Sequence, residues 1–223
     1  MRARLWSYSD AWERAHSNDA ELWQEETARN RELNEQAYAV EDTDPAAAFR
    51  LYLEAAEAGS PWGMEMVGRH YDWGIGVEAD FQKAAEYYHR ALSAGSWMAT
   101  IGYARLLEEH GYQDDCERVL EDGVASDFVP AYFCLAWIRY QRCKSRAACR
   151  EIRPLLEYAA SKGHPAAKVT LTRLMARGKF GLRAIPTAFR LLWRWAPQLD
   201  LEAKQAEEEV RQRRTAAEAP APH

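Results

Sequence analysis

The sequence predicts an all-α fold, a right-handed superhelical α-solenoid of antiparallel helix pairs. Small-residue helix ends recur at Gly59, Gly95, Asp127 and Gly163, which are separated by 36, 32 and 36 residues. Prolines stand where new helices would begin, at positions 45, 61, 130, 165 and 186. No alternating strand pattern competes with the helical periodicity. Units of this length bury their apolar faces by stacking on neighbouring units.

Composition narrows the class of protein. The chain has 223 residues, of which 48% are hydrophobic and 28% are charged, so it is long and apolar enough to bury a sizeable core. Its net charge of −5 argues against a nucleic-acid binder that uses its whole surface. We therefore expect a folded, soluble protein without a nucleic-acid partner.

The helices follow in order from their start and stop signals. We expect a polar helix or pair within 8–40, and then helices near 45–58, 61–73, 80–94, 97–110, 114–125, 130–142, 146–162, 165–177, 186–196 and 200–214. Asp44 and Ser60 are the expected N-caps of the first two repeat helices. Pro154 lies inside one predicted helix, which should kink there or begin later.

These helices divide the chain into four parts. Residues 1–43 are expected to form an N-terminal helical extension, and 44–196 a solenoid of about four helix pairs. Residues 197–214 are expected to form a charged C-terminal helix, and 215–223 a disordered tail.

Residues 66–95 carry a more specific pattern. Val67, Gly68 and Tyr71 follow a Leu-Gly-x-x-Tyr pattern, a Gly-x-Gly-Val turn comes next, and the aromatic-rich second helix closes at Gly95. This stretch resembles the Sel1-like repeat, a relative of the tetratricopeptide repeat. Across 44–196, the resemblance implies structural roles for Gly59, Gly68, Tyr71, Gly74, Gly76, Ala84, Gly95 and Gly163. Since members of such families are mostly adaptors, it also implies a non-catalytic scaffold that holds other proteins.

The first helices of successive pairs would line a concave face. The candidate partner-binding residues on that face are Arg69, Arg105, Phe133, Trp137, Tyr140 and Arg173. Arginines beside aromatic rings would suit an acidic or carboxylate-bearing segment, because a guanidinium bonds carboxylates in pairs and stacks on rings. The alternative is that these arginines pair with neighbouring acids such as Asp72 and Glu108.

Charge is distributed unevenly along the chain. The first 44 residues hold eleven acids and five arginines, whereas the segment from Tyr158 to Leu199 has eight cations and no acid. Its last predicted helix is strongly apolar. The candidate contact residues there are Arg183, Phe189, Arg190, Trp193, Arg194 and Trp195. They could meet an anionic membrane surface or a protein partner, join copies of the chain end to end, or pack on the preceding helix pair and the tail.

No arrangement of residues predicts catalysis. The histidines fall one per helix or turn, and no phosphate-binding loop, nucleophile elbow or zinc helix is present. Cys143 and Cys149 are six residues apart, unlike a two-residue metal clip. We therefore predict no enzyme activity, no cofactor and no metal. The absence of an export signal and of a long apolar run predicts a cytoplasmic protein, with the inner membrane as a candidate contact.

Overall fold

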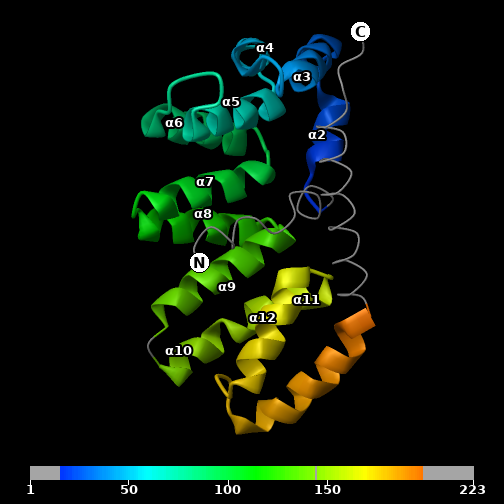
Figure 1. Cartoon of the computed structure of the whole chain (residues 1–223), viewed down its shortest axis with the longest axis vertical. Coiled ribbons are helices and arrows are strands. Elements are labelled where there is room, and N and C mark those ends of the chain that lie inside the picture. The colour runs from blue at the N-terminus through cyan, green and yellow to red at the C-terminus, as the bar shows by residue number, and fades with distance from the viewer. Residues whose placement is uncertain (1–15, 144, 198–223) are drawn as a thin grey trace. The chain divides into compact units, whose positions relative to one another are not determined.

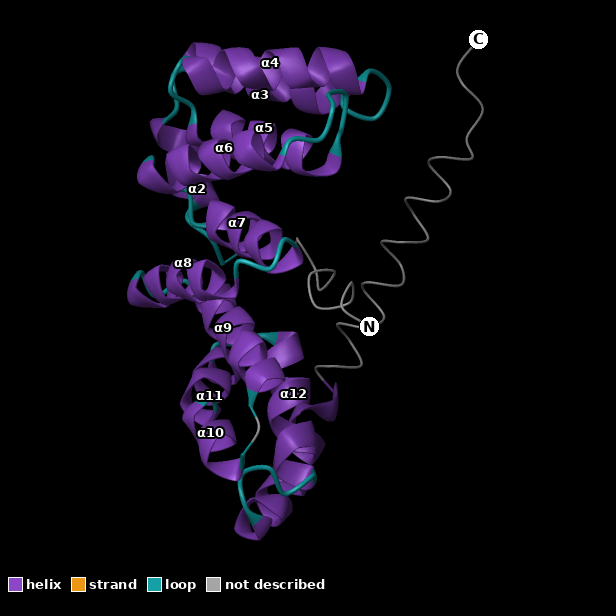
Figure 2. Cartoon of the chain, turned by 90° about the vertical axis from the view of Figure 1, so that its left-hand side faces the viewer, coloured by secondary structure: helices purple, strands orange, loops and turns teal. Residues whose placement is uncertain are grey.

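The computed structural model describes residues 16–143 and 145–197 of the chain. Within these ranges every regular element is a helix, so the predicted all-α class is confirmed (Figure 2). The chain divides into two compact units, residues 1–138 and 139–223. Sequence patterns had placed 44–196 in one solenoid and gave no sign of this division.

After its first described helix, which stands to the side, the first unit is a stack of helices in chain order (Figure 1). Its helices are α2 (Asp19–Glu25), α3 (Ala28–Val40), α4 (Pro45–Glu57), α5 (Pro61–Trp73), α6 (Phe81–Ser93), α7 (Met98–Glu109), α8 (Gln113–Ala125) and most of α9 (Val129–Arg142). From α3 to α8 each helix packs against the next, and α5 also contacts α3 and α7. The predicted solenoid of helix pairs is thereby confirmed. Its first pair is α3 with α4, so the stack begins inside the segment expected to be an extension.

Local sequence explains where the helices begin. Asp44 accepts a hydrogen bond from the amide of Ala47 at 2.9 Å, and Ser60 accepts one from the amide of Gly63 at 3.0 Å. A proline follows each cap at the first helical position, where its missing N–H costs no hydrogen bond. Both predicted caps are therefore present.

Ser60, the N-cap of α5, also links this helix to α2 and α3 through its hydroxyl group. Its hydroxyl donates to Glu26, at the end of α2, and accepts from the Asn34 side chain of α3 at 3.0 Å. The same kind of joint recurs one repeat later, where the Ser96 hydroxyl donates to Glu65 of α5 at 3.3 Å. Buried polar groups of this kind stabilise a structure only while their partners are present.

Two close approaches fix the central helix pair. The ring of Tyr88 in α6 packs directly on Gly68 of α5, as the sequence suggested. The turn after α5 contains Gly76, whose φ of +65° favours glycine, and a Cβ there would lie 2.2 Å from the Pro45 carbonyl oxygen. Larger residues at either position would push the helices apart.

The second unit contains α10 (Arg146–Glu151), α11 (Arg153–Ser161), α12 (Pro165–Ala176), the short 3-10 helix η2 (Leu182–Ala184) and a helix over 185–197. The expected helix 146–162 is interrupted at Ile152, two residues before Pro154, as proline chemistry predicts. His164 caps α12 by accepting from the Ala167 amide at 3.3 Å. The predicted helix and tail beyond residue 197 lie outside the described residues.

Candidate protein-binding surface

The indole of Trp73 forms an exposed platform at the end of α5. Its side chain is 53% exposed, and α5 stops there because Gly74 adopts a left-handed conformation. The Arg69 guanidinium carbon lies 5.0 Å from the ring centroid, and that of Arg105, on α7, lies 4.9 Å from it. Both distances are typical of cation–π contacts. We call Arg69, Trp73 and Arg105 the Trp73 platform.

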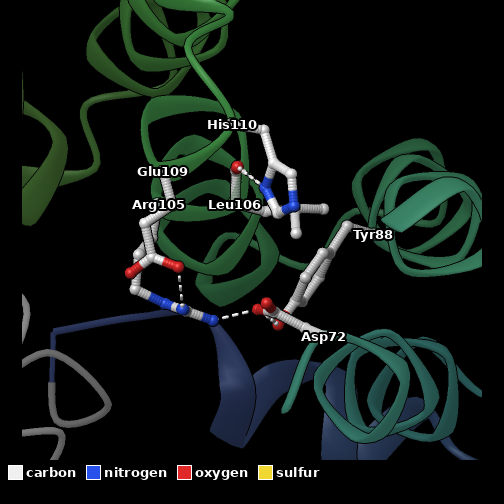
Figure 3. A network of polar contacts seen from close by, with 6 residues as sticks. All are labelled: Asp72, Tyr88, Arg105, Leu106, Glu109 and His110. Carbon is white, nitrogen blue, oxygen red and sulfur yellow. Dashed lines mark hydrogen bonds and ion pairs between the residues drawn. The ribbon is translucent and has the colours of Figure 1, made fainter. Parts of the chain in front are cut away.

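Arg105 is held inside a polar network (Figure 3). It forms an ion pair with Asp72 and a second with Glu109 at 3.1 Å, while the Tyr88 hydroxyl donates to Asp72 at 3.4 Å. The side chains of Arg105 and Asp72 are only 11% and 3% exposed. Of the predicted arginines, Arg105 is therefore the one that pairs with Asp72, which was the alternative interpretation. Its guanidinium contacts the Trp73 ring from a buried position.

Burial and charge act against each other in this network. Burial raises the pKa of Asp72, the charge of Arg105 opposes that rise, and Glu109 adds to it. Burial also disfavours the charged form of Arg105, but the carboxylates of Asp72 and Glu109 outweigh it and raise the Arg105 pKa. The charge of Arg105 therefore favours the ionised form of Asp72.

Arg69 is in a different situation. Its side chain is half-buried, and its Nε has no hydrogen-bond acceptor within the described part of the chain. Glu41 is the nearby acid whose pKa Arg69 helps to lower, although the principal cause of that lowering is its contact with His70, whose Nε2 lies 3.6 Å from Glu41 Oε1. Glu41 also accepts from the Tyr52 hydroxyl at 3.3 Å. Arg69 is thus held in place by Trp73 rather than by an acid.

The other predicted concave-face residues do not join the Trp73 platform. Phe133 is buried in α9, and Trp137 is half-buried on the same helix. Tyr140 and Arg173 belong to the second unit, where Arg173 is exposed. Trp73 itself was missed by sequence reasoning, although it stands four residues after Arg69 and so shares a helix face with it.

The terminal helix presents two different faces. Trp193 is 87% exposed and Phe189 is exposed beside it, whereas Trp195 is half-buried. Arg183, Arg190 and Arg194 are all exposed. The apolar stripe that the sequence treated as one surface is therefore divided between the unit's interior and its outside.

No metal centre is assembled in the part of the chain that the structure describes. It holds no group of three histidines, cysteines or acids that could bind a metal ion. The sulfur atoms of Cys143 and Cys149 are 2.7 Å apart, and burial is the main cause that raises the pKa of Cys149 to about 11. A thiol that stays protonated at neutral pH is a poor nucleophile.

Comparison with known proteins finds a likeness for the segment that carries Arg69 and Trp73. The sequence pattern of the Sel1 repeat matches residues 40–60 and 63–96. These two segments are similar to Sel1 repeats. They contain α4, most of α5 and α6, and with them Arg69 and Trp73. Sel1 repeat proteins generally mediate protein–protein interactions.

One solved structure shows the same fold over a longer stretch. A Sel1 repeat protein from Oxalobacter formigenes superimposes with a TM-score of 0.60 at 17% identity, over 73% of this chain and 71% of that one. The immunity protein Pa5087 from Pseudomonas aeruginosa gives 0.49 at 16% identity, over 74% of this chain and 65% of that one. No curated protein matches the sequence. The first comparison establishes shared architecture and leaves the partner open.

Proposed function

We propose that this chain is a non-catalytic scaffold whose first unit holds a protein segment through a carboxylate bound at Arg69. The observation that carries the proposal is the half-buried Arg69 guanidinium, which stacks on exposed Trp73 and forms no ion pair with a described residue. Sel1 repeats support a role in protein binding, and the cation supports an acidic or carboxylate-bearing partner.

The geometry explains how such a segment would be held. A guanidinium presents its donors in one plane, so it can bond both oxygens of a carboxylate while its face stays on the indole. Trp73 limits the rotation of Arg69 before the partner arrives, which lowers the entropy lost on binding. The Asp72–Arg105 pair anchors the neighbouring guanidinium against the same ring.

Binding rather than catalysis also agrees with how the histidines are used. His70 Nδ1 lies 2.7 Å from the Ile75 carbonyl oxygen, and His110 Nδ1 lies 2.9 Å from that of Leu106. His164 serves as a helix cap. Each of these rings contacts local backbone, and Sel1 repeat proteins are typically non-catalytic.

A peptide-selection experiment tests the proposal. Peptides are selected from a random display library on the immobilised chain, and the best binder is titrated against Arg69→Gln and Trp73→Ala. We expect each change to weaken binding by about tenfold or more, because a charge-assisted hydrogen bond or its support is lost. Replacing the peptide's acids with their amides should weaken binding equally.

Matched control variants distinguish an effect of the proposed site from the effect of losing any exposed arginine or aromatic side chain. Arg50→Gln and Tyr112→Ala make the same kinds of change at exposed positions of the first unit that do not belong to the platform. Binding by these variants should stay within about twofold of the parent. Equal affinity of the Arg69→Gln variant and the parent for an acidic peptide would refute the proposed site.

Self-assembly is a second candidate, and the charge distribution favours it. Residues 139–197 hold fourteen lysines and arginines against two glutamates, while acids predominate in the rest of the chain. Opposite charges would attract the basic unit of one copy to the acidic unit of another. Such association should increase with protein concentration in sedimentation velocity and weaken as salt is added, because salt screens exposed charges.

A further inference from the structure

The second unit carries an apolar stripe on its outside. Leu182 and Phe189 are 73% and 64% exposed, and Trp193 is 87% exposed. Positions 189, 193 and 196 follow one face of the helix over 185–197, since they are spaced by four and three residues. Large apolar side chains gathered on one exposed face usually mark a contact surface.

The remainder of that helix secures it to the unit. Ala184 and Ala188 are buried, and Leu191 and Trp195 are half-buried. These four positions recur at intervals of three and four residues on the side away from Phe189 and Trp193. The helix thus uses one apolar side for its own unit and leaves the other uncovered.

Positive charge borders the uncovered side. Arg190 and Arg194 flank the stripe along the helix, and Arg183 stands just before it; all three are exposed. Further exposed cations occur elsewhere in the unit, at Lys162, Arg173, Arg177 and Lys179. No acidic residue lies between Tyr158 and Leu199, so nothing in this segment neutralises them.

We infer that this surface, the terminal face formed by Leu182, Arg183, Phe189, Arg190, Trp193 and Arg194, binds an anionic lipid bilayer. Tryptophan, phenylalanine and leucine would enter the boundary between headgroups and acyl chains, and the arginines would meet lipid phosphates. The helix would lie in the plane of the membrane surface. In the described ranges, no helix is long and apolar enough to cross a bilayer.

A lipid surface fits the terminal face better than a second copy of the chain does. Attraction between oppositely charged units would involve only the arginines. It does not explain why the apolar side chain of Trp193 is almost fully exposed. Apolar side chains beside cations are typical of helices that bind membrane interfaces. The inference goes beyond the proposed protein-binding function, because it concerns the other unit and different residues.

Vesicle sedimentation of the full chain tests the inference. Vesicles of phosphatidylcholine alone are compared with vesicles that also contain phosphatidylglycerol. We expect the chain to sediment with the anionic vesicles, to remain largely in solution with the neutral ones, and to dissociate as NaCl is raised to about 0.5 M.

Paired variants identify the face responsible. Trp193→Ser should weaken anionic-vesicle binding by about fivefold or more, whereas Trp73→Ser, also at an exposed tryptophan, should leave it unchanged. Arg190→Glu with Arg194→Glu should nearly abolish binding, whereas Arg50→Glu with Arg118→Glu, at exposed positions of the first unit, should have little effect. Circular dichroism checks that every variant is folded.

The results that overturn the inference are equally definite. It fails if the parent chain does not bind phosphatidylglycerol vesicles, or if the Trp193 and Arg190/Arg194 variants bind as well as the parent. It also fails if those arginines prove necessary for concentration-dependent self-association while vesicles are ignored, which would assign the face to a second copy. Arg69→Gln should leave vesicle binding unchanged, so the two proposals stand or fall separately.

Discussion

The ring of Tyr88 occupies the space that a side chain at position 102 would need. A Cβ placed on Gly102 of α7 would lie 2.7 Å from the Tyr88 ring, and one on Gly68 of α5 would lie 3.0 Å from it. Tyr88 is itself almost fully buried. One aromatic ring from α6 therefore sets how closely two first helices of successive repeats approach.

Gly102→Ala should destabilise the protein. In an unobstructed helix interior this change stabilises by about 1 kcal/mol, because glycine is the poorer helix former. Here the new methyl group would overlap the Tyr88 ring, and overpacking of a core costs about 1–3 kcal/mol. We expect a net loss of about 1 kcal/mol, measured by urea denaturation.

The same substitution in a Tyr88→Ala background supplies the control. Once the ring is removed, Gly102→Ala should become neutral or stabilising, and the double-mutant cycle should give a coupling of about 1 kcal/mol or more. Additive effects of the two changes would show that the ring and the glycine do not interact.

Ser60→Ala should lower the free energy of unfolding by more than the loss of an ordinary N-cap does. Loss of the Asp44 cap in Asp44→Ala is expected to cost about 1 kcal/mol. Ser60 caps α5 but also contacts the buried side chains of Glu26 and Asn34, which would both lose a partner. We expect about 3 kcal/mol for Ser60→Ala by chemical denaturation. Equal losses for the two variants would mean that the buried joint contributes little.

The Asp72–Arg105 pair should be far more sensitive to the loss of one partner than to the loss of both charges. Arg105→Met leaves the buried Asp72 carboxyl unpaired and should cost about 3–5 kcal/mol. Adding Asp72→Asn removes that charge and keeps an acceptor for the Tyr88 hydroxyl, so more than half of the lost stability should return. Denaturation midpoints of the parent, single and double variants measure this, and failure of Asp72→Asn to restore stability would contradict it.

Glu41 should make stability depend on pH at the acidic end. The nearby His70 ring, whose Nε2 lies 3.6 Å from Glu41 Oε1, and the charge of Arg69 hold the pKa of Glu41 below its ordinary 4.5 despite burial. A lowered folded-state pKa stabilises the protein above the unfolded-state value, and that contribution is lost as the pH falls through the folded-state pKa. Unfolding free energies at several values between pH 7 and about pH 3 should therefore fall less steeply for Glu41→Gln. Identical slopes would rule out this contribution.

Sequence reasoning worked where local chemistry decides the outcome. The bounds of α5 and the interruption before Pro154 follow from caps, glycines and prolines, which act on their own backbone. The division after residue 138 and the pairing of α3 with α4 depend on contacts between helices. Periodicity along one helix carries no information about which neighbour it meets.

The candidate sites show the same limit. Spacing aligned Arg69 with Arg105, but only tertiary structure reveals that Asp72 neutralises one of them. Likewise, Trp193 and Trp195 are two residues apart and lie on different sides of their helix. Which side of the helix over 185–197 is buried depends on how that helix packs against the rest of the second unit.

Tyr88 connects the buried packing of the helices to the exposed indole of Trp73. Its ring packs against Gly102, and its hydroxyl donates a hydrogen bond to Asp72. Asp72 in turn forms an ion pair with Arg105, whose guanidinium contacts the Trp73 ring. If the Trp73 platform binds a partner as proposed, a mutation buried among α5, α6 and α7 would change the affinity without contacting the ligand. Selection for a new binding preference could then act through buried residues.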